Sequence, residues 1–78
     1  MKNMKEILSH AWDFSLYEVD GKKILTVIFM DRIDYPRSFY ILKEEEGLSL
    51  DGFIQLSRKI RNNYEDYKYR EIVPPVFE

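Results

Sequence analysis

The chain contains no cysteine, a single histidine and only three glycines in 78 residues. Without cysteine there is no disulfide and no thiolate-ligated metal, a composition that suits a reducing compartment. One histidine alone cannot supply a standard zinc site. The three glycines, Gly21, Gly47 and Gly52, do not form a phosphate-binding loop. We therefore expect no metal and no cofactor.

The chain also lacks a strong charge excess and a long apolar run. Fourteen acidic residues against 12 basic residues give a net charge of −2, whereas nucleic-acid-binding domains usually carry a basic excess. No apolar run approaches the roughly 20 residues that cross a bilayer. The first eight residues are too short and too polar for a signal peptide. We expect a soluble, cytoplasmic protein.

Apolar residues are plentiful: they make up 45% of the chain, and 12 residues (one Trp, six Tyr and five Phe) are aromatic. A disordered segment would contain fewer aromatic and β-branched residues. The length predicts one domain near the lower limit for a self-sufficient core. Because such a core seldom provides more than about 3–5 kcal/mol, a partner or a second copy would add stability.

The clearest local signal is a β-hairpin. Asp20-Gly21 separates two segments of alternating apolar residues, 12–19 and 22–30, and a type I′ turn needs positive φ at both central residues. A two-residue turn places Val19 opposite Lys22, and the register continues from there. One face then carries Trp12, Phe14, Leu16, Leu25, Val27 and Phe29, and we expect it to be core. The other face carries Asp13, Ser15, Tyr17, Ile24, Thr26, Ile28 and Met30, a mixed set that is too apolar for full exposure.

Beyond the hairpin, a third strand and a helix are predicted. Residues 31–37, which contain Pro36, are typical of a loop, and residues 38–43 alternate as a strand. The period then changes to 3.6, which predicts an amphipathic helix over residues 50–62, with Ser49 as N-cap. Its apolar stripe is formed by Leu50, Phe53, Ile54, Leu56, Ile60 and Tyr64.

The two ends of the chain are less regular. Residues 3–9 are compatible with one or two helical turns, and residues 64–73 with a short edge strand that Pro74-Pro75 must stop. The predicted architecture is a single α+β domain: a three-stranded antiparallel meander with one amphipathic helix in the C-terminal half packed on one face, and room for a fourth, edge strand. Its parts are an N-terminal segment (1–10), the meander (11–43), the helix (49–62) and a tail (64–78).

Residues of catalytic type are scarce. His10 lies three positions before Asp13 and next to Ser9, but catalytic triads are assembled by the fold rather than by local order. We expect His10 to be an exposed residue at a strand entrance. The acidic residues of the loops (Asp31, Asp34, Glu44, Glu45 and Glu46) lack the order of a calcium-binding loop, and we expect them to be solvated. We expect no enzymatic activity.

The surplus aromatic residues and one acidic segment favour a protein partner, because Tyr and Met are enriched in interfaces. We predict a non-enzymatic protein-binding domain, most concretely a small bacterial inhibitor of the immunity or antitoxin kind that blocks a basic enzyme. Acidic side chains would accelerate its association by electrostatic steering. The expected contact residues are Glu44, Glu45, Glu46, Asp51, Tyr17, Ile28, Met30 and Tyr40.

Two alternatives remain open. Residues 58–70 carry a local excess of three positive charges, so a nucleic-acid-binding or regulatory module would use Arg58, Lys59, Arg61, Lys68 and Arg70. The predicted order of elements resembles that of the double-stranded-RNA-binding domain. That family places lysines at the start of its last helix, where this chain has Ser49-Leu50-Asp51-Gly52 after three glutamates, so the function is not carried over. The third reading is a homodimer joined through the free sheet face.

Overall fold

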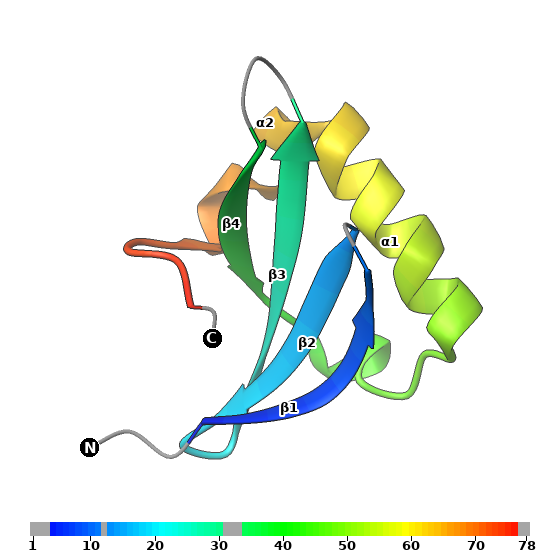
Figure 1. Cartoon of the computed structure of the whole chain (residues 1–78), viewed down its shortest axis with the longest axis vertical. Coiled ribbons are helices and arrows are strands. Elements are labelled where there is room, and N and C mark those ends of the chain that lie inside the picture. Colours follow the sequence, from blue (N-terminus) through cyan, green and yellow to red (C-terminus); the bar gives the residue numbers. More distant parts are fainter. Residues whose placement is uncertain (1–3, 12, 31–33, 77–78) are drawn as a thin grey trace.

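The computed structural model describes residues 4–11, 13–30 and 34–76. Five antiparallel strands form one sheet in the order β1-β2-β3-β4-β5, and helix α1 packs across one of its faces (Figure 1). The strands are β1 (Met4–His10), β2 (Phe14–Val19), β3 (Lys22–Met30), β4 (Asp34–Tyr40) and β5 (Glu71–Ile72). The helices are α1 (Leu50–Asn62), α2 (Tyr64–Tyr67) and the 3₁₀ turns η1 (Lys43–Glu45) and η2 (Lys68–Arg70).

The hairpin has the predicted turn and the predicted register. Asp20 and Gly21 have φ angles of +53° and +82°, which are the two positive values that a type I′ turn requires. Val19 pairs with Lys22, and Phe14 pairs with Val27 at the far end of the ladder. Trp12, placed at the start of the first strand by the sequence pattern, lies outside the described residues.

The sheet has more strands than the three of the predicted meander, and the first is where helical turns were expected. β1 pairs antiparallel with β2, with Met4 opposite Val19 and His10 opposite Phe14, and its register shifts between Glu6 and Leu8. The seven residues of β1 are too few for a stable helix in isolation. Pairing with the open edge of β2 therefore decides their conformation. The first element of the chain is thus a strand, where helical turns were expected from the sequence.

The third predicted strand is real, but its boundaries are shifted. β4 begins at Asp34 and ends at Tyr40, so part of the predicted loop (31–37) is strand and the last predicted strand residues (41–43) are not. Pro36 lies opposite Ile28, in the part of β4 that β5 does not cover. This position suits a residue that has no N–H for a neighbouring strand.

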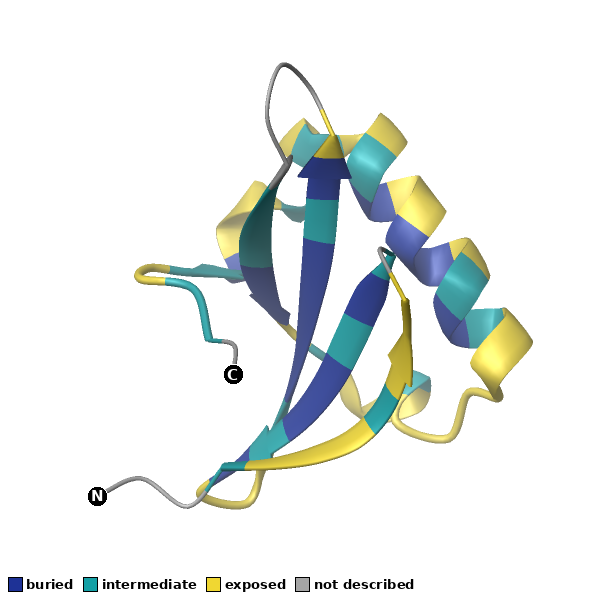
Figure 2. Ribbon diagram, viewed as in Figure 1, coloured by how far each residue is buried: buried dark blue, intermediate teal, exposed yellow. Residues whose placement is uncertain are grey.

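α1 has the predicted boundaries. The side chain of Ser49 accepts a hydrogen bond from the backbone N–H of Gly52 at 3.3 Å, as an N-cap does. The helix buries Phe53, Leu56 and Ile60 against the sheet (Figure 2). The main core consists of these three residues with Phe14, Leu16, Leu25, Val27, Phe29 and Phe39.

The tail folds differently from the edge strand predicted for residues 64–73. One turn of α2 and the η2 turn come first, and only Glu71 and Ile72 pair with β4. The sheet face opposite α1 is also not left open. Tyr17, Val19 and Ile24 form a second buried cluster, with Met4, Ile72 and Val76 packed against it. The two ends of the chain thus cover part of the face that we expected to be free.

A substitution at Ile60 measures how much the packing of α1 contributes to the stability of the fold. It is 1% exposed, so Ile60→Ala removes a buried side chain and leaves a cavity, and we expect a loss of about 2–5 kcal/mol in the free energy of unfolding. Arg58→Ala, on the solvent face of the same helix, should change it by less than about 0.5 kcal/mol. Urea unfolding at pH 7 measures both. Equal effects would mean that α1 does not pack as described.

Candidate functional site

The acidic segment at residues 44–46 is divided by the fold. The Glu45 carboxylate accepts a hydrogen bond from Arg70 Nη1 at 2.7 Å and another from the backbone N–H of Leu42 at 3.0 Å. Arg70 is 7% exposed, so this is a largely buried ion pair that ties η1 to η2. Glu45 is therefore a structural residue.

Glu46 is also engaged, although more weakly. Its carboxylate lies 3.5 Å from Lys23 Nζ, and both side chains are partly exposed. This ion pair therefore contributes little to the stability of the fold. Glu44 and Asp51 are exposed. Because two of the three consecutive glutamates face cations of this chain, the segment presents less negative charge to a partner than its sequence suggests.

The structure separates the sheet residues that were expected to contact a partner. Tyr17 is 4% exposed and belongs to the second core cluster, whereas Met30 is 58% and Tyr40 44% exposed. Tyr40 pairs with Ile24 at one end of β3 and Met30 lies at its other end, six residues away, or roughly 20 Å. Ile28 is half-buried. Of these four residues, Tyr40 is the one nearest in sequence to the acidic segment, four positions before Glu44.

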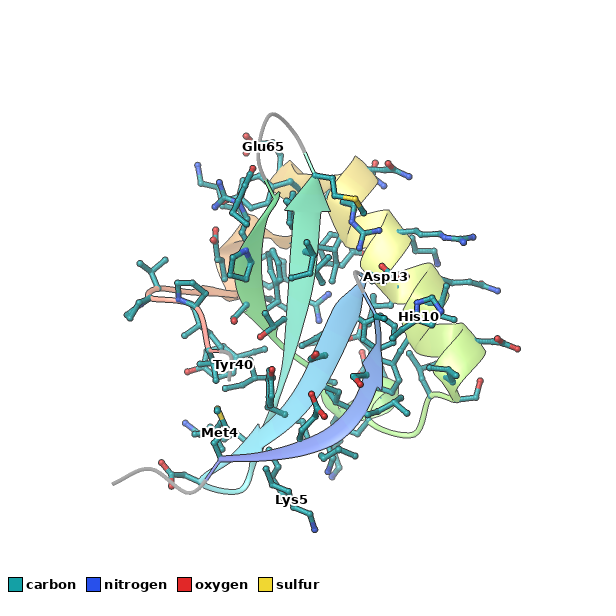
Figure 3. All side chains as sticks on the ribbon, in the orientation of Figure 1. Met4, Lys5, His10, Asp13, Tyr40 and Glu65 are labelled. Carbon is teal, nitrogen blue, oxygen red and sulfur yellow. The ribbon has the colours of Figure 1, made fainter. Side chains whose placement is uncertain are left out.

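A hollow of about 210 Å³ lies beside Tyr40, at the end of the sheet that carries the β2–β3 turn. Tyr40 is labelled in Figure 3. It is lined by Val19, Asp20, Lys22, Ile24, Tyr40, Ile72 and Val76. Lys22 Nζ lies 5.8 Å from the centre of the Tyr40 ring, at the rim. The hollow is partly open to solvent, and its lining is about equally polar and apolar.

Sequence reasoning found only part of this hollow. The hairpin register places Ile24 on the second face, and Tyr40 was an expected contact residue. Ile72 and Val76 come from the tail, and no local pattern indicates that the tail returns to this face.

A network of contacts holds Ile72 in place beside β4. Arg37 Nη1 donates to Glu71 at 2.8 Å and to the Tyr64 hydroxyl at 3.1 Å, and its guanidinium carbon lies 4.6 Å from the centre of the Tyr64 ring. The hydrogen bond with Glu71 raises the pKa of Arg37. The Tyr64 hydroxyl also donates to Glu71, and this raises the pKa of Tyr64. These contacts fasten α2 and β5 to β4.

His10 and Asp13 lie beside α1, at the opposite end of the sheet from Tyr40 (Figure 3). His10 Nδ1 is 3.2 Å from the Asp13 carboxylate, and the Ser57 hydroxyl lies 3.1 Å from the same carboxylate. Arg61 Nη2 donates to this carboxylate and to the Asp13 carbonyl, while Arg61 Nε donates to the carbonyl of Ile28 at 2.8 Å. Ser57 thus contacts Asp13 rather than His10, and the cluster joins α1 to the sheet.

The same contacts shift the pKa of Asp13. Burial alone would raise it, but the hydrogen bond and charge of Arg61, with hydrogen bonds from Ser57 and His10, lower it below its ordinary value of 3.8. The carboxylate is therefore held in its charged form.

The basic residues of the alternative nucleic-acid surface are also divided. Arg61 is bound to Asp13 and Arg70 to Glu45. Arg58, Lys59 and Lys68 are exposed. The expected basic patch therefore loses two of its five cations to internal ion pairs.

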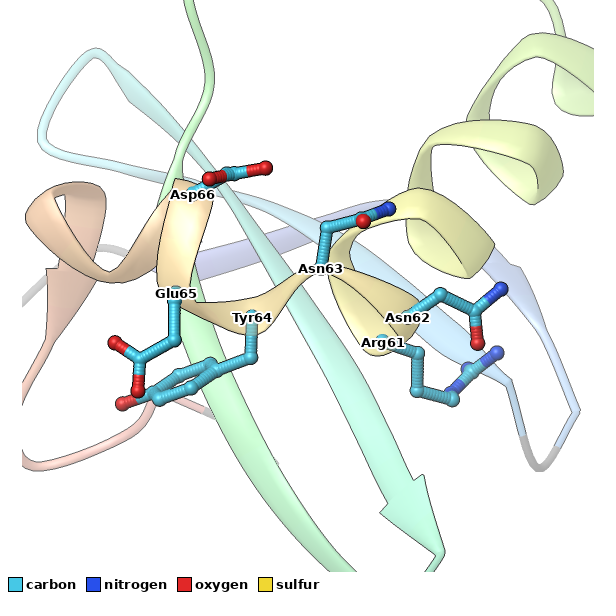
Figure 4. Close-up of a pocket in the computed structure, with 6 residues that line it drawn as sticks. All are labelled: Arg61, Asn62, Asn63, Tyr64, Glu65 and Asp66. Atoms are coloured by element: carbon cyan, nitrogen blue, oxygen red, sulfur yellow. The ribbon is translucent and has the colours of Figure 1, made fainter.

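A second, wider hollow of about 400 Å³ lies at the junction of α1 and α2 (Figure 4). It is lined by Arg61, Asn62, Asn63, Tyr64, Glu65 and Asp66. In Figure 4 the side chains of Glu65 and Asp66 point in different directions, and Arg61 is already paired. Within residues 4–11, 13–30 and 34–76, no three His, Cys, Asp or Glu side chains group in a way that could hold a metal ion.

Comparisons with protein-family models, curated proteins and solved structures each found no match for this chain. Among the residues that the structure describes, no helix has the length and apolar character to cross a membrane.

Glu45 and its neighbours make a matched set for testing the ion pair with Arg70. Glu45→Gln leaves a buried guanidinium without its counter-charge, and we expect a loss of about 3 kcal/mol in the free energy of unfolding. Glu44→Gln, at an exposed position one residue earlier, should change it by less than about 0.5 kcal/mol. Chemical denaturation at pH 7 provides both values. A Glu45→Gln variant with the same free energy of unfolding as the native chain would contradict the structural role of Glu45.

Asp13 gives a pH-dependent prediction. Its pKa is lower in the folded chain than in the unfolded chain, so its carboxylate stabilises the fold above pH 3.8, and this contribution disappears as the pH falls through the folded value. Asp13→Asn should cost about 2 kcal/mol at pH 7. Urea unfolding at several pH values should show the gap to the native chain closing below pH 3.8. A gap that stays constant with pH would refute this account.

Proposed function

We propose that the protein is a small, non-enzymatic binding domain that holds a protein partner at the turn end of its second sheet face. The observation that carries this proposal is the hollow of about 210 Å³ beside Tyr40. Val19, Ile24, Ile72 and Val76 supply apolar walls, and a partly exposed tyrosine stands at the rim. Such an arrangement accepts one anchoring side chain of a partner.

The surroundings of the hollow support a protein partner. Tyr69 within η2 and Val73 directly after β5 are 76% and 80% exposed, and exposed aromatic and apolar side chains are typical of interfaces. Asp20 and Lys22 at the rim provide one charge of each sign. A partner would therefore match a mixed polar rim around an apolar centre.

The most concrete form of the proposal is an inhibitor of the immunity or antitoxin kind that blocks a basic enzyme. The small size, the net charge of −2 and the exposed carboxylates of Glu44 and Asp51 support it. Electrostatic steering would depend on these two residues, because Glu45 is held by Arg70. The contact surface is thus the hollow, Tyr40 and Glu44, in place of the whole sheet face.

A photo-crosslinking residue at position 40 of the full chain tests the proposal in a lysate of the native host. We expect one predominant cross-linked protein, and none from the same residue at Gln55, which is exposed on α1. Tyr40→Ala should then weaken binding of that purified protein by about tenfold or more, as loss of an anchor residue does. Gln55→Ala is the matched control.

Two outcomes would count against this proposal. Identical cross-linked proteins from positions 40 and 55 would mean that Tyr40 marks no specific contact. Cross-linking only to a second copy of the chain would replace the inhibitor by a homodimer, which sedimentation would detect.

A further inference from the structure

The last described residues of the chain form a strap over the second sheet face. We call residues 73–76 the strap; they follow β5 and end at Val76 (Figure 1). The backbone N–H of Val76 donates to Ser38 Oγ at 2.7 Å, and the carbonyl of Val76 accepts from the hydroxyl of Thr26. The two hydroxyls lie 2.8 Å apart. Val76 therefore gives both of its backbone polar groups to one pair of side chains.

This hydroxyl pair recognises a backbone and not a particular side chain. Thr26 and Ser38 are 2% and 0% exposed and face each other across β3 and β4. Their oxygens supply one acceptor for an N–H and one donor for a C=O, which is what a single residue of any extended peptide requires. The hollow beside Tyr40 is lined in part by Val76, the residue that bonds to this pair. Together the pair and the hollow have the two parts of a peptide-binding site.

The strap fills this site incompletely. The hollow of about 210 Å³ lies between Val76, Ile72 and the sheet residues Val19, Ile24 and Tyr40. A larger side chain than valine at the Val76 position would bury more apolar surface, worth about 0.8 kcal/mol for each added methylene. A peptide with such a side chain would therefore make more apolar contact with the hollow than Val76 does.

Release of the strap costs the packing of Val76 against the second cluster and its hydrogen bonds to Ser38 and Thr26. Val73 is 80% exposed and Pro74 is exposed as well, so the first half of the strap has few contacts to lose. After release, one of the two hydroxyls can still donate to the other. The second O–H donor loses the Val76 carbonyl and is left for water on the uncovered face.

We propose that the Thr26–Ser38 pair and the hollow form a binding site for an extended peptide segment of the partner, and that the strap occupies this site until such a segment displaces it. The segment presents a residue of the size of Leu, Met or Phe where Val76 now lies. This inference rests on the proposed function, because it assigns the partner to the same end of the sheet. The peptide binds only molecules in which the strap is released. Its apparent association constant is therefore the intrinsic constant multiplied by the fraction of such molecules.

A titration followed by NMR tests the displacement. The probe is the peptide acetyl-Ile-Val-Pro-Pro-Leu-amide, which copies residues 72–76 with leucine in the last position. The proteins are the native full chain and Val76→Asp, in which a carboxylate opposes the apolar hollow and opens the strap. We expect the variant to bind the probe at least about tenfold more tightly than the native chain does, because the intramolecular competitor is removed. The NMR signals of Ile24, Thr26 and Ser38 should change in chemical shift on binding.

Two controls make the comparison specific. Val73→Asp places the same charge on the strap at an 80% exposed position and should bind the probe as the native chain does. A probe that ends in valine should bind Val76→Asp about fourfold more weakly than the leucine probe, the value of one buried methylene. Equal affinity of Val76→Asp and the native chain, or no binding to either, would overturn the proposal.

Hydrogen exchange on the native chain keeps the test decisive if Val76→Asp does not fold. The amide of Val76 should exchange at least about tenfold faster than that of Leu25, through a local opening that denaturant does not accelerate. Exchange of both amides only by global unfolding would overturn the proposal. If a partner cross-links at position 40 but the strap never opens, only the displacement fails and the binding function stands.

Discussion

The two-residue turn at Asp20-Gly21 is the constraint on which the rest of the structure depends. Because both residues adopt positive φ, the register of β2 and β3 is set without a bulge. A shift of the pairing by one residue would turn the side chains of one strand to the opposite face. If β3 shifted, Val27 would leave the core beneath α1, and Thr26 would leave the second face on which the strap binds. The helix core and the strap site thus follow from one turn.

The features that could be predicted from the sequence are those that depend on interactions between residues close together in the chain. The turn, the ladder from Val19 to Phe14 and the boundaries of α1 all follow from periodicity and capping, and all are confirmed. β1 could not be predicted in the same way, because its residues favour neither period strongly and gain their partner only when the edge of β2 exists. The tail is a similar case: Glu71 and Ile72 form a strand because Arg37, 34 residues earlier than Glu71, holds them beside β4.

Charge patterns mislead for a related reason. Three consecutive glutamates suggest an acidic surface, and five cations within residues 58–70 suggest a basic one. In the fold, Glu45 binds Arg70 from 25 positions away and Asp13 binds Arg61 from 48 positions away. The first pair removes one residue from each expected patch, and the second removes Arg61 from the basic one. Partners at such separations are set by the packing of η1, η2 and α1, which a charge count along the chain does not contain.

One signal in the sequence did point toward the strap, through chemistry rather than periodicity. Thr26 lies in the middle of an otherwise apolar stretch of β3, and Ser38 stands opposite it on β4. A hydroxyl that is buried on a sheet face needs a hydrogen-bond partner outside the ladder, since the ladder uses only backbone groups. Two such hydroxyls side by side require either a polar side chain or a crossing backbone. The remainder of that face offers Tyr17, Val19 and Ile24, whose apolar bodies favour a peptide that brings its own N–H and C=O together with an apolar side chain. A buried hydroxyl pair of this kind on a sheet face therefore marks the place where a segment of chain crosses it, as Val76 does here.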